Sequence, residues 1–312
     1  MAATNYLRKV DVLNVPTDTM VKTEQIGGVE VHFVFFETWD GLFAPMALRL
    51  PEGDGPFPII LLGSGNGGEA MRWHRDALAN RSYILDVLVD AGYACAWLRY
   101  RTEVELGYND GGSMVRDMRQ GREMFNRSPL EYEDEIAAIE FVRQLDLFDP
   151  DRVGLVGVSH AGEMILKITS EYHGAAVGVC CEPASHEYLA LTPDDSAFVN
   201  EETQLRNIEE MQMAESAKVR GRIDIDIANQ RIAGINTPLL IMGRDEDHLQ
   251  GIFRTTYDLL HEAGKEVEWV TYDHPLHGYI YPERGAEGDY QVDDTQRESI
   301  AYVVSYLDRY LK

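Results

Sequence analysis

Short, largely apolar runs recur along this chain at residues 58–62, 93–98, 153–156, 175–180 and 239–242. The segment 267–272 is also strand-like but contains Glu268 and Thr271. A strand of a parallel sheet, buried on both faces, requires such a run. Upstream, residues 29–36 and 42–50 are rich in β-branched and aromatic residues and flank a turn at Trp39-Asp40-Gly41. They predict two antiparallel strands near the N-terminus.

Segments with helical spacing of apolar residues alternate with these runs. The predicted helices are 81–90, 131–145, 161–172, 253–263 and 295–311. Strands that alternate with helices predict an α/β fold with a doubly wound, mostly parallel sheet of the eight-stranded type. At 312 residues the chain can bury a substantial core, and we expect a single domain over 1–312.

One segment, residues 184–235, interrupts the alternation. It contains no convincing buried strand, and 201–220 has the apolar spacing of a helix. Ligands bind at the carboxyl ends of the strands in open α/β sheets, and an insertion between two strands lies near them. We therefore expect a helical cap over a substrate pocket. The alternative is a surface excursion unrelated to the site.

Composition narrows the choice of partners. Acidic residues number 53 against 28 basic ones, for a formal net charge of −25. Such a charge repels nucleic acid and anionic lipid, so the expected partner is a small molecule. No signal peptide core or membrane-spanning run is visible, and the three cysteines form no C-x-x-C pair. We expect a cytoplasmic protein without a metal site, and the oligomeric state stays open.

A serine stands at a strand–helix junction in the hexapeptide Gly157-Val158-Ser159-His160-Ala161-Gly162. Small neighbours allow a sharp turn that exposes the hydroxyl, while the N–H of His160 points to the same place. A serine that merely caps the helix is the alternative. The hexapeptide resembles the G-x-S-x-G nucleophile elbow of the α/β-hydrolase superfamily, with Ala161 in place of the second glycine. The resemblance implies that Ser159 is a nucleophile, followed in the chain by an acid and then a histidine.

A candidate histidine follows the run 267–272. His277-Gly278-Tyr279 resembles the H-G-F or H-G-Y ending of the dienelactone-hydrolase and prolyl-oligopeptidase-like branches of that superfamily. The resemblance makes His277 the general base that a serine nucleophile needs. His274 is followed by proline, and we expect it to shape the loop.

The acid has several candidates. The segment 237–243 with the residues after Gly243 resembles the P-x-L-x-x-x-G-x-x-D stretch that presents the acid in the superfamily. Its register leaves Asp247 and Glu246 open, with Asp247 preferred, and Asp245 is expected to serve the turn or a salt bridge. Glu182 is a further option, because some members place the acid after the strand that corresponds to 175–180.

An oxyanion hole requires two donors aimed at the developing negative charge. The N–H of His160 is one, and the resemblance places the other in the loop after 58–62, at Gly65 or Asn66. That loop lacks the lysine of a P-loop and does not match G-x-G-x-x-G, which disfavours nucleotide binding.

These features together predict a serine hydrolase that cleaves a carboxylic ester through an acyl-enzyme and uses no cofactor. A peptidase, an acyl-CoA thioesterase or acyltransferase, and a non-catalytic ligand-binding module are the alternatives. The residues ahead of the first predicted strand are too few for an N-terminal propeller, which favours small esters. We expect activity to follow the deprotonation of His277 near an unperturbed pKa of about 6.5.

Overall fold

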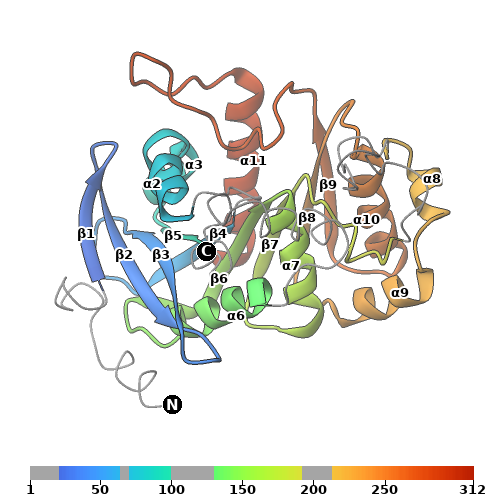
Figure 1. Ribbon diagram of the computed structural model, residues 1–312, viewed down its shortest axis with the longest axis horizontal. Coiled ribbons are helices and arrows are strands. Elements are labelled where there is room, and N and C mark those ends of the chain that lie inside the picture. Colours follow the sequence, from blue (N-terminus) through green and yellow to red (C-terminus); the bar gives the residue numbers. More distant parts are fainter. Residues whose placement is uncertain (1–20, 64–69, 100–129, 192–212) are drawn as a thin grey trace, which may run out of the picture.

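The computed structural model describes residues 21–63, 70–99, 130–191 and 213–312 (Figure 1). Their strands form one nine-stranded sheet in the order β1-β2-β3-β5-β4-β6-β7-β8-β9. The strands are Val21–Ile26 (β1), Val29–Glu37 (β2), Phe43–Arg49 (β3), Phe57–Gly63 (β4), Ala94–Leu98 (β5), Phe148–Val158 (β6), Val177–Cys181 (β7), Leu239–Arg244 (β8) and Val267–Tyr272 (β9). The pairs β1–β2, β2–β3 and β3–β5 are antiparallel, and the pairs from β5 to β9 are parallel.

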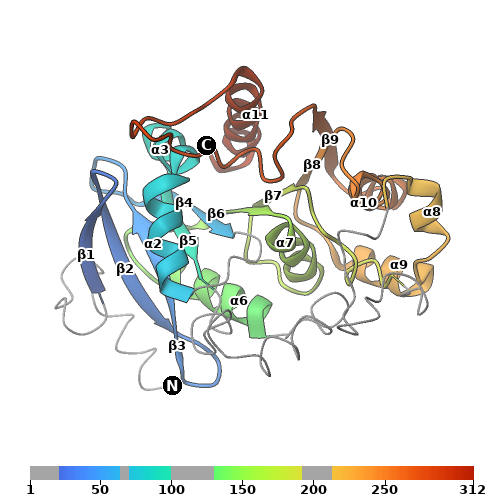
Figure 2. The ribbon, with the colours of Figure 1, turned by 45° about the horizontal axis from the view of Figure 1, so that its top comes forward.

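Helices cover both faces of this sheet. They are Ala70–Asn80 (α2), Tyr83–Asp90 (α3), Leu130–Val142 (α6), His160–Glu171 (α7), Ser216–Arg220 (α8), Ile225–Gly234 (α9), Gln250–Glu262 (α10) and Asp294–Leu311 (α11). In Figure 2 the sheet lies between α3 and α11 above it and α6 and α7 below it. The predicted doubly wound α/β architecture is confirmed, with one strand more than expected.

The apolar runs of β4, β5 and β8 form strands because alternate residues are buried in two separate cores. In β4, Ile59 and Leu61 belong to the core under α6, α7, α9 and α10. Ile60 and Leu62 belong to the core under α2, α3 and α11. All four side chains are fully buried. A polar residue at any of these positions would lie in a core, which explains the absence of polar alternation.

The first strand was not predicted. Residues Val21–Ile26 pair antiparallel with β2, and the two strands are joined by Gly27-Gly28. Both glycines have positive φ, 60° and 84°, as a two-residue hairpin turn requires. This Gly-Gly turn before an alternating strand was the available signal. Helix α2, Ala70–Asn80, was also missed.

The predicted cap is described only in part. Within 184–191 and 213–235, the structure contains α8 and α9; α8 packs against α10, and α9 against α7 and α10. Of the helix predicted over 201–220, the described part is helical at Ser216–Arg220. Residues 192–212 lie outside the described part, so the covering role of this segment stays a prediction.

Among the residues that the structure describes, no helix is long and apolar enough to cross a bilayer.

Candidate active site

The register of the parallel strands brings four chain segments to one edge of the sheet. Val158 at the end of β6 pairs with Cys181 at the end of β7, and Cys181 pairs with Met242 in β8. The next residues therefore stand side by side: the N–H of Ser159 donates to Cys181, and the N–H of Glu182 donates to Met242. Because all these strands end at the same edge, residues far apart in sequence meet there.

Ser159 occupies a strained turn between β6 and α7. Its φ is 58° and its ψ −117°, a region that residues with a Cβ seldom adopt. A Cβ at Gly157 would lie 2.6 Å from the backbone of Ala161, and one at Gly162 would lie 3.1 Å from Pro183. The small residues of the hexapeptide are therefore required by close approach of strand, turn and helix. Ser159 itself is partly exposed.

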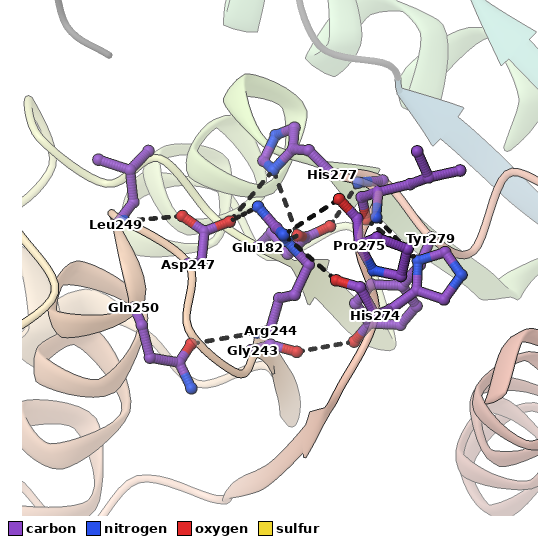
Figure 3. A network of polar contacts seen from close by, with 12 residues as sticks. Glu182, Gly243, Arg244, Asp247, Leu249, Gln250, His274, Pro275, His277 and Tyr279 are labelled. Atoms are coloured by element: carbon purple, nitrogen blue, oxygen red, sulfur yellow. Dashed lines mark hydrogen bonds and ion pairs between the residues drawn. The ribbon is translucent and has the colours of Figure 1, made fainter. Parts of the chain in front are cut away.

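His277 follows β9 and faces two carboxylates (Figure 3). Its Nδ1 atom lies 3.2 Å from Oε1 of Glu182 and 3.7 Å from Oδ2 of Asp247. Both carboxylates are buried, whereas the imidazole is 41% exposed. The shorter distance is within hydrogen-bonding range and the longer is not, so Glu182 is the direct partner in this geometry. The ring turns its other nitrogen away from the carboxylates.

Arg244, the last residue of β8, lies between the same two carboxylates. Its Nε atom donates to Glu182 at 2.9 Å and its Nη2 atom to Asp247 at 2.5 Å. Asp247 also accepts from the N–H of Leu249, and Glu182 from the N–H of Gly278. These charge-assisted bonds compensate the cost of burying two negative charges side by side.

This environment changes the protonation of the imidazole. Burial lowers the pKa of His277, but the nearby carboxylates of Asp247 and Glu182 outweigh it and raise the pKa to about 10. Burial raises the pKa of Asp247, yet the neighbouring imidazole of His277, the N–H of Leu249 and the charge of Arg244 lower it to about 2. Both carboxylates favour the imidazolium that forms when a histidine accepts a proton.

The loop of His277 lies beside the serine turn. A Cβ on Gly278 would approach Val158, the residue before Ser159, to 3.3 Å. The N–H of Gly278 donates to Glu182, and the carbonyl of Ser159 accepts from the N–H of Ala184. The turn that carries Ser159 and the loop that carries His277 are therefore neighbouring segments.

Several solved structures superpose on this chain. Dipeptidyl peptidase 4 of Porphyromonas gingivalis superposes with a TM-score of 0.59 at 19% identity, over 90% of this chain and 35% of that one. The thermostable carboxylesterase EstE1, from a metagenomic library, gives 0.56 at 16% over 100% and 96%. A putative dienelactone hydrolase of Klebsiella pneumoniae gives 0.53 at 14% over 90% and 99%. The chain has the α/β-hydrolase fold.

This chain spans about a third of the length of the peptidase, and identities below 20% establish the fold alone. No family model and no curated protein matches the sequence. The predicted resemblance to the α/β-hydrolase superfamily is confirmed at the level of the fold.

The candidate acids differ in their position relative to His277. Glu246 is exposed, with φ of 61°, and the structure shows no contact between it and His277 among the described residues. Asp245 accepts from the hydroxyl of Thr271 and so serves the turn. Glu182, the least favoured candidate from the sequence, lies nearest to His277. Its φ of 49° is a second strained position at this edge of the sheet.

His274 has the loop-shaping contacts that were expected. Its ring accepts from the N–H of Leu276 at 3.1 Å and lies 2.9 Å from Asp293, the N-cap of α11. These bonds attach the loop before His277 to the start of the last helix.

The proposed oxyanion donors are placed only in part. Gly65 and Asn66 lie outside the described residues. His160 begins α7, and its buried ring lies 2.7 Å from Glu131 of α6 and 3.9 Å from Glu163. The ring is thus held away from the edge of the sheet where its own N–H is expected to act.

Sequence reasoning missed two residues that contact members of the candidate site, Arg244 and Glu131. The signal for Arg244 was its position directly after a buried strand, next to the segment considered for the acid. For Glu131 there was none, because its contact depends on how α6 packs against α7.

Proposed function

We propose that this protein is a serine hydrolase that cleaves carboxylic esters through an acyl-enzyme. The observation that carries the proposal is the strained Ser159 beside a histidine loop that is backed by buried carboxylates. Strain at a residue in this position is retained where the surrounding structure holds it for a function. Carboxylesterases among the matched structures support an ester as the substrate.

In this mechanism Ser159 attacks the carbonyl carbon of the ester while Nε2 of His277 accepts the hydroxyl proton. The carboxylate at Nδ1 keeps the ring in the tautomer that can accept it. The N–H of His160, with a second donor from the loop 64–69, binds the oxyanion of the tetrahedral intermediate. The proton on His277 then passes to the leaving alcohol. Water, deprotonated by the same imidazole, releases the acid from Ser159.

The test uses the Ser159→Ala variant with a series of p-nitrophenyl esters of increasing acyl length. We expect hydrolysis to fall by about 10³-fold or more, since serine supplies the only nucleophile in this scheme. Ser170→Ala is the matched control, because Ser170 lies on the helix that follows Ser159 and, among the described residues, its hydroxyl bonds only to the backbone carbonyl of Lys167. Its activity should equal that of the unmodified protein.

A fluorophosphonate probe gives a second readout. Mass spectrometry should locate one adduct, on Ser159, in the folded protein. Full esterase activity of Ser159→Ala, or a folded protein that the probe does not label, would reject the proposal. An aminoacyl arylamide and an acyl-CoA, assayed in parallel, distinguish a peptidase and a thioesterase from an esterase.

A further inference from the structure

We propose that His277 is served by two acids, Glu182 and Asp247, and that Arg244 is the positioning residue that allows both to act. This inference rests on the proposed function, because it concerns the base that activates Ser159. It replaces a choice between two candidate acids with a shared role for both.

The two acids and the imidazole lie close together. One carboxylate oxygen of each acid and Nδ1 of His277 lie within 4.8 Å of one another. Glu182 is at 3.2 Å and Asp247 at 3.7 Å, so a small rotation of the exposed ring exchanges the nearer partner. The two acids also come from different strand ends, after β7 and within the turn after β8. Neither is merely a sequence neighbour of the other.

Arg244 also balances the charge of the two acids. Two buried carboxylates so close together repel each other, and without compensation one of them would take up a proton. The guanidinium of Arg244 lies on both and cancels one negative charge. The histidine then faces one net negative charge, as in a triad with a single acid. When His277 is protonated during the reaction, the four side chains together are neutral.

All three side-chain nitrogens of Arg244 donate hydrogen bonds at this site. Beyond the two carboxylates, its Nη1 atom donates to the carbonyls of His274 at 3.2 Å and Pro275 at 3.4 Å. One planar group therefore attaches the ends of β7 and β8 to the loop that carries His277 (Figure 3). A lysine could supply the charge but not this fixed fork of donors.

The remaining titratable groups around the cluster are few among the described residues. His248 places Nδ1 3.3 Å from the second oxygen of Asp247, and the thiol of Cys181 lies 3.8 Å from Glu182. Tyr279 donates its hydroxyl to the carbonyl of Gly243, so it stands behind the cluster. None of the three bridges the two acids as Arg244 does.

The experiment measures the pH dependence of kcat/KM for a p-nitrophenyl ester in Glu182→Gln, Asp247→Asn and the double variant. Each single variant should retain activity within about tenfold at its own optimum, because one acid remains. The double variant should lose about 10³- to 10⁴-fold, the loss that follows removal of the acid from a triad. Each single variant should also shift the midpoint of the rise in kcat/KM, which follows deprotonation of His277, to lower pH, since one charge that favours imidazolium is gone. Asp245→Asn is the matched control in the same turn and should shift nothing.

Arg244 is tested by Arg244→Met and Arg244→Lys. Loss of the positive charge should raise the midpoint in Arg244→Met, and Arg244→Lys should return it part of the way. Circular dichroism and thermal unfolding verify that each variant is folded. A folded Arg244→Met with an unchanged profile would show that Arg244 has only a structural role. One single acid variant as inactive as the double would show that a single acid serves the histidine.

NMR titration of the His277 imidazole supplies a readout that does not depend on esterase activity. The pKa of His277 should fall in each acid variant and rise in Arg244→Met. If the unmodified protein neither hydrolyses esters nor binds the probe, the proposed function fails while these shifts still decide the shared-acid inference. Unaltered pKa values in all three variants would overturn it.

Discussion

Replacement of Ser159 by glycine should make the protein more stable while it abolishes ester hydrolysis. The serine has φ of 58° and ψ of −117°, and a residue held in such a region costs about 1–3 kcal/mol. Glycine adopts this conformation freely but loses about 0.5–1 kcal/mol through the greater entropy of its unfolded chain. The net expectation for Ser159→Gly is therefore a gain of about 1 kcal/mol. In a chain of this length that gain corresponds to a Tm increase of roughly 1–3 °C.

Ser159→Ala is the necessary comparison for this prediction. Alanine also removes the hydroxyl but keeps the Cβ, so it should remain strained and unfold close to the temperature of the unmodified protein. Differential scanning calorimetry of the three proteins, with urea unfolding as a second measure, separates the effects. If the glycine and alanine variants unfold at the same temperature, the turn stores no strain and the argument from backbone conformation is refuted.

Three further predictions concern the core and the elbow. Gly157→Ala should destabilise the protein by about 1–3 kcal/mol or more in urea unfolding, because the new methyl would lie 2.6 Å from the backbone of Ala161. Burial raises the pKa of Glu135 to about 8 from 4.5, so its contribution to stability is complete below pH 4.5 and is lost as the pH rises through 8. Glu135→Gln should therefore lose less stability than the unmodified protein between pH 5 and 9. The three cysteines are buried, and burial raises the pKa of Cys95 to about 12; a thiol reagent should label them only after unfolding, and labelling of the native protein at the same rate would contradict this.

The order of strands and helices was readable from the chain because burial on two faces constrains every residue of a strand. Ile59 to Leu62 had to be apolar, and a continuous apolar run identifies such a strand without knowledge of its neighbours. The serine turn was readable for the same kind of reason. Gly157 is small because the backbone of Ala161, four residues further on, passes too close for a side chain, and that requirement is local in sequence.

The partners of His277 were decided by the tertiary structure. Asp247 was preferred from a local pattern, and Glu182 was only a further option. Glu182 approaches the histidine because β7 pairs between β6 and β8, a relation between segments that no local pattern contains. Arg244 lies between the two acids because β8, which it ends, pairs with β7. Residue spacing along one strand reports which face is buried, whereas the residues that meet at the edge of a sheet depend on strand order and register. The buried face of a strand could be inferred from the sequence, whereas the residues that meet at the edge of the sheet could be identified only from the fold.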